Sequence, residues 1–492
     1  MMQRFALLIS LLLVNAASFS ADKPKYNVLH IISDDLCTRL GCYGDPMVKS
    51  PNIDRLAAHG VRFEHAYCQF PLCNPSRASF MTGLRPDTTK VYENATQFRK
   101  NVPDAVSLPQ SFQKGGYHVA RVGKIYHYAV PAQIGTSGLD DPASWDKFIN
   151  PKGRDIDDLS TIELLTLKDG KATTRKAEKL EETGGTMSWL AAEGADEDQT
   201  DGKGATAAIQ MLEENAKSGS PFYLAVGFYR PHTPYVAPKH YFDLYPPQTI
   251  KVPQVPPNLK ELFPAAALAS HRPAELAMDD DLKKLALQAY HGSTTFMDAQ
   301  VGRLLDALDR LKLTDHTIIV FQSDHGYHLG EKNLWQKMSL FEEATHVPLI
   351  IAVPGSQNSG KTCQKIVELV DLHKTLTDLC GISADAKTQG YSMRPLLENV
   401  NAPWDHPAFT QVTRGVKYNL TKTDPENKDK KQIMGRTIRT DRWRYTEWDE
   451  GRSGAELYDQ DADPGEYKNL AAAPSSAKTL AKLKEMLHAG GQ

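Results

Sequence analysis

The chain lacks a large excess of charge of either sign. Its 492 residues include 57 Lys and Arg and 60 Asp and Glu, so the formal net charge is −3. A surface for nucleic acid therefore has no support in the composition. Because the molecule carries so little net charge, any anionic polymer would have to be held by local basic groups. The sequence also contains no internal repeat.

Apolar sequence is too sparse for a polytopic membrane protein, since hydrophobic residues make up 41% of the chain. One apolar run, Phe5 to Val14, follows Arg4 and precedes small residues up to Ser20. It is shorter than the roughly 20 residues of a membrane span, and the pattern is typical of a secretory signal peptide. We expect residues 1–20 to be cleaved near Ser20, leaving a periplasmic or secreted protein without stable membrane insertion. The alternative is an uncleaved N-terminal anchor.

Cysteine is scarce, with six in the chain. Export would permit disulfide bonds, but the sequence does not fix their pairing. Cys363 with Cys380 is one candidate bridge and Cys37 with Cys42 a weaker one. Free buried thiols are the alternative for these four residues and for Cys68.

The sixth cysteine lies in the segment CNPSRASFMTG, residues 73–83. A C-x-P-S-R match arises by chance in only about 0.3 per cent of chains this long, at about one in twenty per fixed residue. Pro75 and Ser76 suit the first turn of a helix, and Gly83 suits its end. Cys73 would then lie just before a helix N-terminus that favours anions, with Arg77 as a fixed cation one turn in. Taken alone, a buried structural thiol and an ordinary surface arginine are the alternative.

Residue pairs that can bind a metal ion follow two apolar runs that predict buried strands. Residues 27–33 lead into Asp34 and Asp35, and residues 317–323 lead into Asp324 and His325. Ligands in open α/β sheets collect beyond the carboxyl ends of the strands, so both pairs can meet there. Taken singly, each pair could equally cap a helix or turn after its strand.

The segment around Cys73 resembles the maturation signature of the type I sulfatases. The resemblance implies that Cys73 is oxidised after synthesis to formylglycine by a formylglycine-generating or an anaerobic sulfatase-maturating enzyme, so it must stay unpaired. The hydrated aldehyde offers one hydroxyl to attack sulfur and a second whose collapse expels sulfate, which is covalent catalysis.

The same resemblance implies a divalent metal held by Asp34, Asp35, Asp324, His325 and an oxygen of the matured Cys73. Hard oxygen ligands favour Ca²⁺, with Mg²⁺ as the alternative. His325 departs from many sulfatases, which place an amide side chain there, and it is similar to the iduronate-2-sulfatase-like branch.

Four further residues match family elements. Lys124 and His127, in GKIYH, would steady the diol and take its proton. His232, in RPHTPY, would contact sulfate. Lys337 would contact sulfate and act with His232 in protonating the leaving oxygen. In isolation each would be an ordinary polar group, but their order along the chain follows the family pattern.

The resemblance runs from about residue 27 to 354 and resumes near 456. It implies an alkaline-phosphatase-like α/β fold, with a large, mostly parallel sheet between helices in residues 21–403. A C-terminal subdomain, 404–492, would hold a short antiparallel sheet and a helix. Apolar residues from 282 to 311 predict long amphipathic helices, and the polar stretch 150–201 predicts a surface insertion that borders the site. A lysine-rich stretch is either a solvated loop, which we favour, or a glycan contact: Lys417, Lys422, Lys428, Lys430 and Lys431.

The sequence therefore predicts a hydrolase that removes an O-sulfate from a carbohydrate, such as a glycosaminoglycan fragment with a 2-O-sulfated uronic acid. One alternative is a phosphomonoesterase or phosphodiesterase of the same superfamily, which would normally carry a Ser or Thr nucleophile and ligands for two metals. The other is a non-catalytic protein that binds sulfated glycans.

Overall fold

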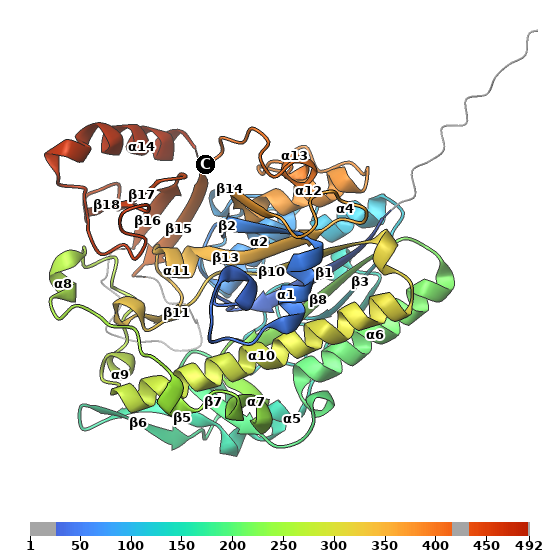
Figure 1. The fold of residues 1–492 in the computed structure, drawn as a ribbon, viewed down its shortest axis with the longest axis horizontal. Helices are drawn as coiled ribbons and strands as arrows, with labels where there is room; N and C mark the ends of the chain where they lie inside the picture. Colours follow the sequence, from blue (N-terminus) through green and yellow to red (C-terminus); the bar gives the residue numbers. More distant parts are fainter. Residues whose placement is uncertain (1–25, 416–431, 491–492) are drawn as a thin grey trace, which may run out of the picture.

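A large mixed sheet forms the centre of the fold (Figure 1). The computed structural model describes residues 26–415 and 432–490, so the predicted signal peptide and the lysine-rich stretch lie outside the described residues. The strands in spatial order are β14 (Thr362–Glu368), β2 (Val61–Tyr67), β13 (His346–Ala352), β10 (Thr317–Ser323), β1 (Asn27–Asp34), β8 (Phe222–Pro231), β3 (His118–Gly123) and β4 (Lys147–Ile149). Only β13 runs antiparallel to its neighbours among these strands, which confirms the mostly parallel sheet.

Helices cover both faces of this sheet, which is why its central strands are apolar throughout. One face packs against α1 (Pro51–His59), α6 (Thr200–Ser218) and α10 (Asp280–Arg310). The other face packs against α2 (Cys73–Thr82), α4 (Leu108–Lys114), α12 (Leu372–Leu379) and α13 (Arg394–Glu398). The core is therefore two apolar layers, one on each side of the sheet.

The periodic stretch after Met278 forms one continuous helix, α10, with its N-terminus capped by the Asp279 carboxylate on the Leu282 N–H. It lies beside α6 beneath the sheet in Figure 1. Most of the expected residues face the core, but Leu285 is 38% exposed. The helical spacing therefore wrongly assigns Leu285 to the face of α10 that packs on the sheet.

The polar stretch 150–201 contains more structure than a loop. It supplies β5 (Glu163–Lys168), β6 (Lys171–Lys176) and β7 (Ser188–Ala192), which form a second sheet with β9 (Tyr235–Pro238). Because β9 follows His232 directly, this insertion lies beside the predicted site. The helix expected from about residue 204 to 215 is α6, which begins earlier and ends later.

The C-terminal part contains a four-stranded antiparallel sheet of β15 (Ala408–Arg414), β16 (Ile433–Arg439), β17 (Trp443–Trp448) and β18 (Ala455–Asp459). The final helix, α14 (Ala477–Ala489), packs on it. This confirms the expected short antiparallel sheet and closing helix. Short elements complete the described chain: α3 (Pro86–Thr89), α5 (Arg154–Asp157), α7 (Lys239–Asp243), α8 (Leu259–Leu262), α9 (Pro273–Leu276), α11 (Glu342–Thr345), β11 (His328–Leu329) and β12 (Trp335–Gln336). Within the described residues, no helix combines the length and apolarity needed to cross a bilayer.

All six cysteines are free thiols, so neither candidate disulfide forms. The Cys363 thiol lies 3.6 Å from the carbonyl of Val400, whereas Cys380 ends α12 and interacts with Tyr117. The Cys37 Sγ atom lies 3.4 Å from the Tyr290 hydroxyl oxygen. The thiols thus have separate partners, in agreement with the alternative of free cysteines.

Candidate active site

The residue pairs that follow the two strands, Asp34 with Asp35 and Asp324 with His325, meet at the carboxyl edge of the central sheet. Strands β1 and β10 pair in parallel with Ser33 opposite Ser323, so the residues that follow each strand emerge side by side. The Asp35 backbone has a φ of 67° and its N–H donates to Asp324 Oδ1 at 3.1 Å. The sequence prediction that these carboxylates come together is therefore supported by strand register.

Cys73 lies at the first turn of α2, directly facing this acidic edge. Its Sγ is 3.2 Å from Lys337 Nζ, 3.5 Å from His325 Nε2 and 3.8 Å from Asp35 Oδ1. The helix begins at Cys73 instead of at Pro75, because the Ser76 N–H bonds back to the Leu72 carbonyl at 3.1 Å. Cys73 is thus inside the first turn and not just before it. The reactive position remains at the positive end of the helix.

Arg77 is completely buried and fixes two of the carboxylates. Its Nε lies 2.9 Å from Asp324 Oδ2 and its Nη2 lies 3.1 Å from Asp34 Oδ1. Its Nη1 donates to the carbonyls of Lys124 and Ile125 at 2.6 and 2.9 Å. The guanidinium therefore uses four of its five N–H donors to hold two carboxylates and the backbone after β3, which is a more specific role than a free cation beside an anion.

Lys124 and His127 follow strand β3 into the same site. Gly123 has a φ of 73°, and an added Cβ would lie 2.2 Å from the Gly227 carbonyl oxygen, so only glycine fits this close turn. Lys124 Nζ lies 2.5 Å from Asp34 Oδ2. The Nδ1 atom of His127 is buried and has no hydrogen-bond partner among the described residues. Burial, reinforced by the Lys124 charge, holds the pKa of His127 well below its ordinary value, so this imidazole is neutral.

His232 is carried by the segment that follows β8. Its Nδ1–H donates to the Thr233 carbonyl at 2.6 Å, and its Nε2 points toward Asp35 Oδ2 at 3.8 Å. The buried carboxylate of Asp201 accepts from the backbone N–H groups of Tyr229 and Arg230 at 2.9 Å each. These bonds fix the end of β8 and so the direction from which His232 enters the site.

Lys337 reaches the site from the segment after β12. Its Nζ lies 2.5 Å from Asp35 Oδ1. Its neighbours Gln336 and Met338 have φ values of 67° and 74°, so the chain turns sharply on both sides of it. Although burial lowers the pKa of Lys337, the Asp35 carboxylate raises it above its ordinary value, so the ammonium stays charged.

The electrostatics of the site depend on these lysines. Burial raises the pKa of the Cys73 thiol and so does Asp34, but Lys124 and Lys337 bring the value down to about 7. Burial also opposes ionisation of Asp34 and Asp35, yet the surrounding cations keep both pKa values well below the ordinary one. The site therefore combines a readily ionised sulfur with permanently charged carboxylates.

The donor set fits a divalent metal ion. Two overlapping groups have ligand atoms within 4.8 Å of one another: Asp34, Asp35, Cys73 and His232, and Asp34, Cys73, Asp324 and His325. The His325 Nδ1–H donates to the Gly326 carbonyl at 2.9 Å, so Nε2 is the nitrogen that faces the carboxylates. Although burial lowers the pKa of His325, Asp324 raises it to about 10, so a metal would have to displace a proton there. Each group contains two carboxylates, and carboxylate oxygens suit Ca²⁺ or Mg²⁺.

All of the predicted site residues therefore gather in one buried cluster. Sequence reasoning missed residues that support it. The Tyr290 hydroxyl on α10 donates to the Asp35 carbonyl at 2.8 Å and accepts from the Cys37 N–H at 3.0 Å. Thus α10 supports the site as well as covering the sheet. In the sequence, the only indication of this role of Tyr290 is a hydroxyl-bearing aromatic residue within a largely apolar helix. No sequence feature indicated the role of Asp201.

Comparison with known proteins identifies the family of the chain. The sulfatase family model matches residues 26–382, and a model of the C-terminal part of N-sulphoglucosamine sulphohydrolases matches residues 330–491. Iduronate 2-sulfatase from Homo sapiens is 33% identical, covering 90% of this chain and 90% of the relative. A sulfatase from Formosa agariphila is 32% identical, covering 95% of this chain and 86% of the relative.

Solved structures share the fold. A phosphonate monoester hydrolase from Silicibacter pomeroyi superimposes with a TM-score of 0.74 at 22% identity, covering 94% of this chain and 95% of that chain. A protein described as a 2-O GAG sulfatase gives a TM-score of 0.69 at 24% identity, covering 94% of this chain and 91% of that one. At this level of identity the likeness establishes the alkaline-phosphatase-like architecture.

Proposed function

Because the chain belongs to the sulfatase family, and is therefore a sulfuric ester hydrolase, we propose that it removes an O-sulfate from a carbohydrate after Cys73 matures to formylglycine. One observation carries the proposal. The Cys73 side chain points from a helix N-terminus at three carboxylates, while the ammonium group of Lys337 contacts its sulfur at 3.2 Å. This arrangement suits a charged, metal-assisted nucleophile and has no purpose in a purely structural thiol.

Maturation would replace the soft sulfur by oxygen. The hydrated aldehyde supplies one hydroxyl for in-line attack on sulfur and a second whose collapse releases sulfate. Conversion of Cys73 would require a formylglycine-generating or anaerobic sulfatase-maturating enzyme as a partner. The predicted signal peptide, residues 1–20, would take the product to the periplasm or the exterior.

The metal ion would be held by Asp34, Asp35, Asp324, His325 and an oxygen of the matured residue. We infer Ca²⁺, because three hard carboxylates dominate the set. The ion would supply positive charge that favours ionisation of the hydroxyl and screens the sulfate oxygens. Arg77 keeps two of the carboxylates in position for it.

The remaining residues have distinct proposed roles. The ammonium group of Lys124 contacts Asp34, and that of Lys337 contacts Asp35. Both lysines would stabilise negative charge on the nucleophile and the sulfate. His127 is neutral and its Nδ1 is unpartnered among the described side chains, so it can accept a proton from the diol. His232 would contact sulfate and, together with Lys337, protonate the leaving oxygen.

Relatives suggest which substrates to try first. The names iduronate 2-sulfatase and 2-O GAG sulfatase point to a 2-O-sulfated uronic acid, whereas a relative at 30% identity is a choline-sulfatase from Rhizobium meliloti. We favour a glycosaminoglycan-like saccharide. Choline sulfate is the appropriate counter-substrate because it bears no sugar.

The decisive experiment is a sulfate-release screen on protein produced together with a formylglycine-generating enzyme. Peptide mass spectrometry should show the aldehyde at position 73, and Cys73→Ala should abolish turnover. Cys42→Ala is the matched control, because Cys42 is a free thiol outside the cluster, and it should retain activity. Full turnover with an intact thiol at position 73, or a clear preference for phosphate over sulfate esters, would contradict the proposal.

A further inference from the structure

A hollow separate from the active-site cluster lies in the C-terminal part of the molecule, between α14, the segment before β15 and the turn from β16 to β17. It encloses about 500 Å³. Its walls include the rings of Trp404, His406 and Trp443 and the side chains of Lys478 and Lys482. It shares no residue with the cluster around Cys73. The proposed reaction therefore does not explain it.

Aromatic rings form one wall of this hollow. Tyr391 stacks on His406 with ring centroids 3.7 Å apart and an interplanar angle of 12°, and Trp404 meets His406 edge-on at 4.8 Å. The Trp404 indole N–H donates to the Ile366 carbonyl at 2.6 Å, which fixes the ring. Tyr391 lies outside the lining, but the lining residues Trp404, His406 and Trp443 are all partly exposed. Rigid, partly exposed rings offer a surface against which the apolar C–H face of a sugar can pack.

Charged side chains that make no ion pair with another described residue also line the hollow. Lys478 and Lys482 are exposed and lie four residues apart on α14, so they project from the same face of the helix. Neither they nor Asp405 and Asp441, which also line the hollow, make an ion pair with another described residue. Ammonium groups can bind sulfate, and carboxylates can accept hydrogen bonds from sugar hydroxyls.

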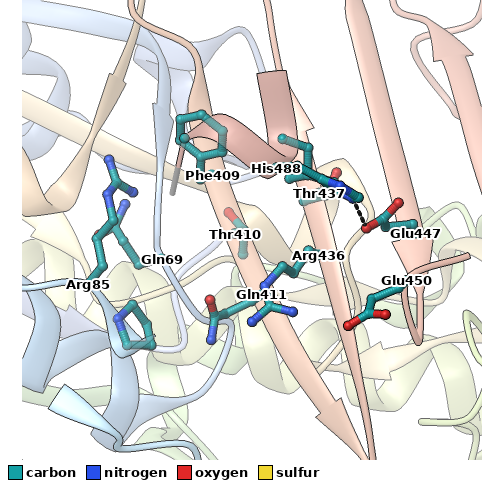
Figure 2. Close-up of a pocket in the computed structure, with 13 residues that line it drawn as sticks. Gln69, Arg85, Phe409, Thr410, Gln411, Arg436, Thr437, Glu447, Glu450 and His488 are labelled. Carbon is teal, nitrogen blue, oxygen red and sulfur yellow. Dashed lines mark hydrogen bonds and ion pairs between the residues drawn. The ribbon is translucent and has the colours of Figure 1, made fainter. Parts of the chain in front are cut away.

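The hollow shown in Figure 2 provides a contrast. It encloses about 390 Å³ and is also lined by charged side chains. There, however, Arg85 is paired with Glu368, Arg436 with Asp87, and His488 with Glu447. The pair of Arg436 with Asp87 joins the C-terminal sheet to the rest of the fold, and the other two pairs each lie within one part. Lys478 and Lys482, which make no ion pair with another described residue, have no such structural use.

We propose that the hollow around Trp443, Lys478 and Lys482 binds a sulfated saccharide chain and holds polymeric substrate near the enzyme. The substrate class rests on the proposed function, but the binding itself does not require turnover. The aromatic wall packs against a sugar ring, and the two lysines bind its sulfate groups. Removal of the lysines should therefore weaken binding of a sulfated chain and leave hydrolysis of a small sulfated monosaccharide unchanged.

The test uses isothermal titration of full-length Cys73→Ala protein, which cannot turn substrate over, with a heparin-derived tetrasaccharide. In this background, Lys478→Ala with Lys482→Ala should lower the stoichiometry by one site or weaken that site at least about tenfold, which is about 1.4 kcal/mol. Lys484→Ala is the control for loss of a positive charge on α14, because Lys484 lies on the same helix outside the hollow and should be replaceable without loss of binding. Trp443→Ala should weaken the same site, while a desulfated tetrasaccharide should not bind it.

Equal binding by the double-lysine variant and its parent would overturn the proposal, as would equal binding of the desulfated chain. Binding that is lost on Lys478 and Lys482 substitution supports the proposal even if no sulfate ester is hydrolysed. In that case the proposed reaction alone fails. On otherwise wild-type matured enzyme, the double variant should raise the KM for a sulfated polymer without changing kcat on the monosaccharide.

Discussion

The ion pair between Arg230 and Asp155 gives a sharp test of how the insertion supports catalysis. The two side chains are 1% and 2% exposed, and Arg230 Nη2 lies 2.5 Å from Asp155 Oδ2. The other Asp155 oxygen accepts from the Thr200 N–H at 3.0 Å. Arg230 Nη1 also reaches the carbonyl of His232 at 3.5 Å. The pair therefore links the insertion, the start of α6 and the segment that carries His232.

Substitution of Asp155 by Asn should destabilise the protein by about 3 kcal/mol. Breaking a buried ion pair costs about 3–5 kcal/mol because the remaining charge is uncompensated, and the amide oxygen that remains favours the lower end of that range. Because Arg230 would also release the His232 carbonyl, kcat should fall, by up to about 100-fold for a shift near 1 Å. Urea unfolding followed by circular dichroism measures the first effect, and sulfate release measures the second.

A matched control lies in the same insertion. Glu163 pairs with Lys176 at 2.5 Å, but these side chains are 33% and 56% exposed. Glu163→Gln should therefore change the free energy of unfolding by at most about 1 kcal/mol and leave kcat unchanged. In a double-mutant cycle, adding Arg230→Gln to Asp155→Asn should recover part of the lost stability, since no buried charge is left unpaired. If Asp155→Asn and Glu163→Gln have the same small effect, the reasoning is refuted.

Three further predictions concern other parts of the fold. Arg77→Lys should weaken Ca²⁺ binding about 10- to 100-fold, measured by calorimetry, because the carboxylates lose an orienting partner. Burial raises the pKa of Glu275 to about 7. The folded protein therefore loses stability as the pH rises from about 4.5, the pKa of an unfolded Glu, through 7, because the buried carboxyl must ionise. Glu275→Gln should remove about 3 kcal/mol of this pH-dependent loss, measured by unfolding curves at pH 5 and 8. Gly83→Ala should lower the melting temperature by several degrees, because φ is +68° and the new Cβ would lie 2.7 Å from Thr388; a melting temperature equal to wild type would contradict it.

The sequence predicts those parts of the site that follow from local pattern. Apolar runs that end in acidic residues predict strands with carboxylates at their carboxyl ends, and parallel pairing of β1 with β10 then brings Asp34 and Asp324 together. Pro75, Ser76 and Gly83 similarly predict the helix that presents Cys73, although its first residue was placed two positions too late. Helix boundaries are the least constrained feature of such patterns.

Long-range partners were not predictable from the pattern. Arg230 stands two residues from His232, but its partner Asp155 lies 75 residues earlier, in a stretch without a clear period. Lys337 meets Asp35 across 302 residues. The pairing of β7 with β9 likewise joins distant segments, which is why the polar stretch predicts a surface insertion but not the sheet within it. Local propensity carries no information about these contacts, which depend on tertiary packing.

The charges around Cys73 explain why so polar a cluster can be buried. Asp34, Asp35 and Asp324 are matched by Arg77, Lys124 and Lys337, so the metal-free cluster is close to neutral apart from the thiol and the histidines. Arg77 uses four of its five N–H donors and contacts two carboxylates, whereas each lysine makes a single ion pair with a carboxylate. A divalent ion bound to those carboxylates would weaken the hold on both ammonium groups. Two positive charges would then be in excess, which would favour both the single negative charge of a sulfate ester and an ionised nucleophile. Under the proposed function, the same two lysines would thus stabilise the carboxylates without a metal and the reacting groups once a metal is bound.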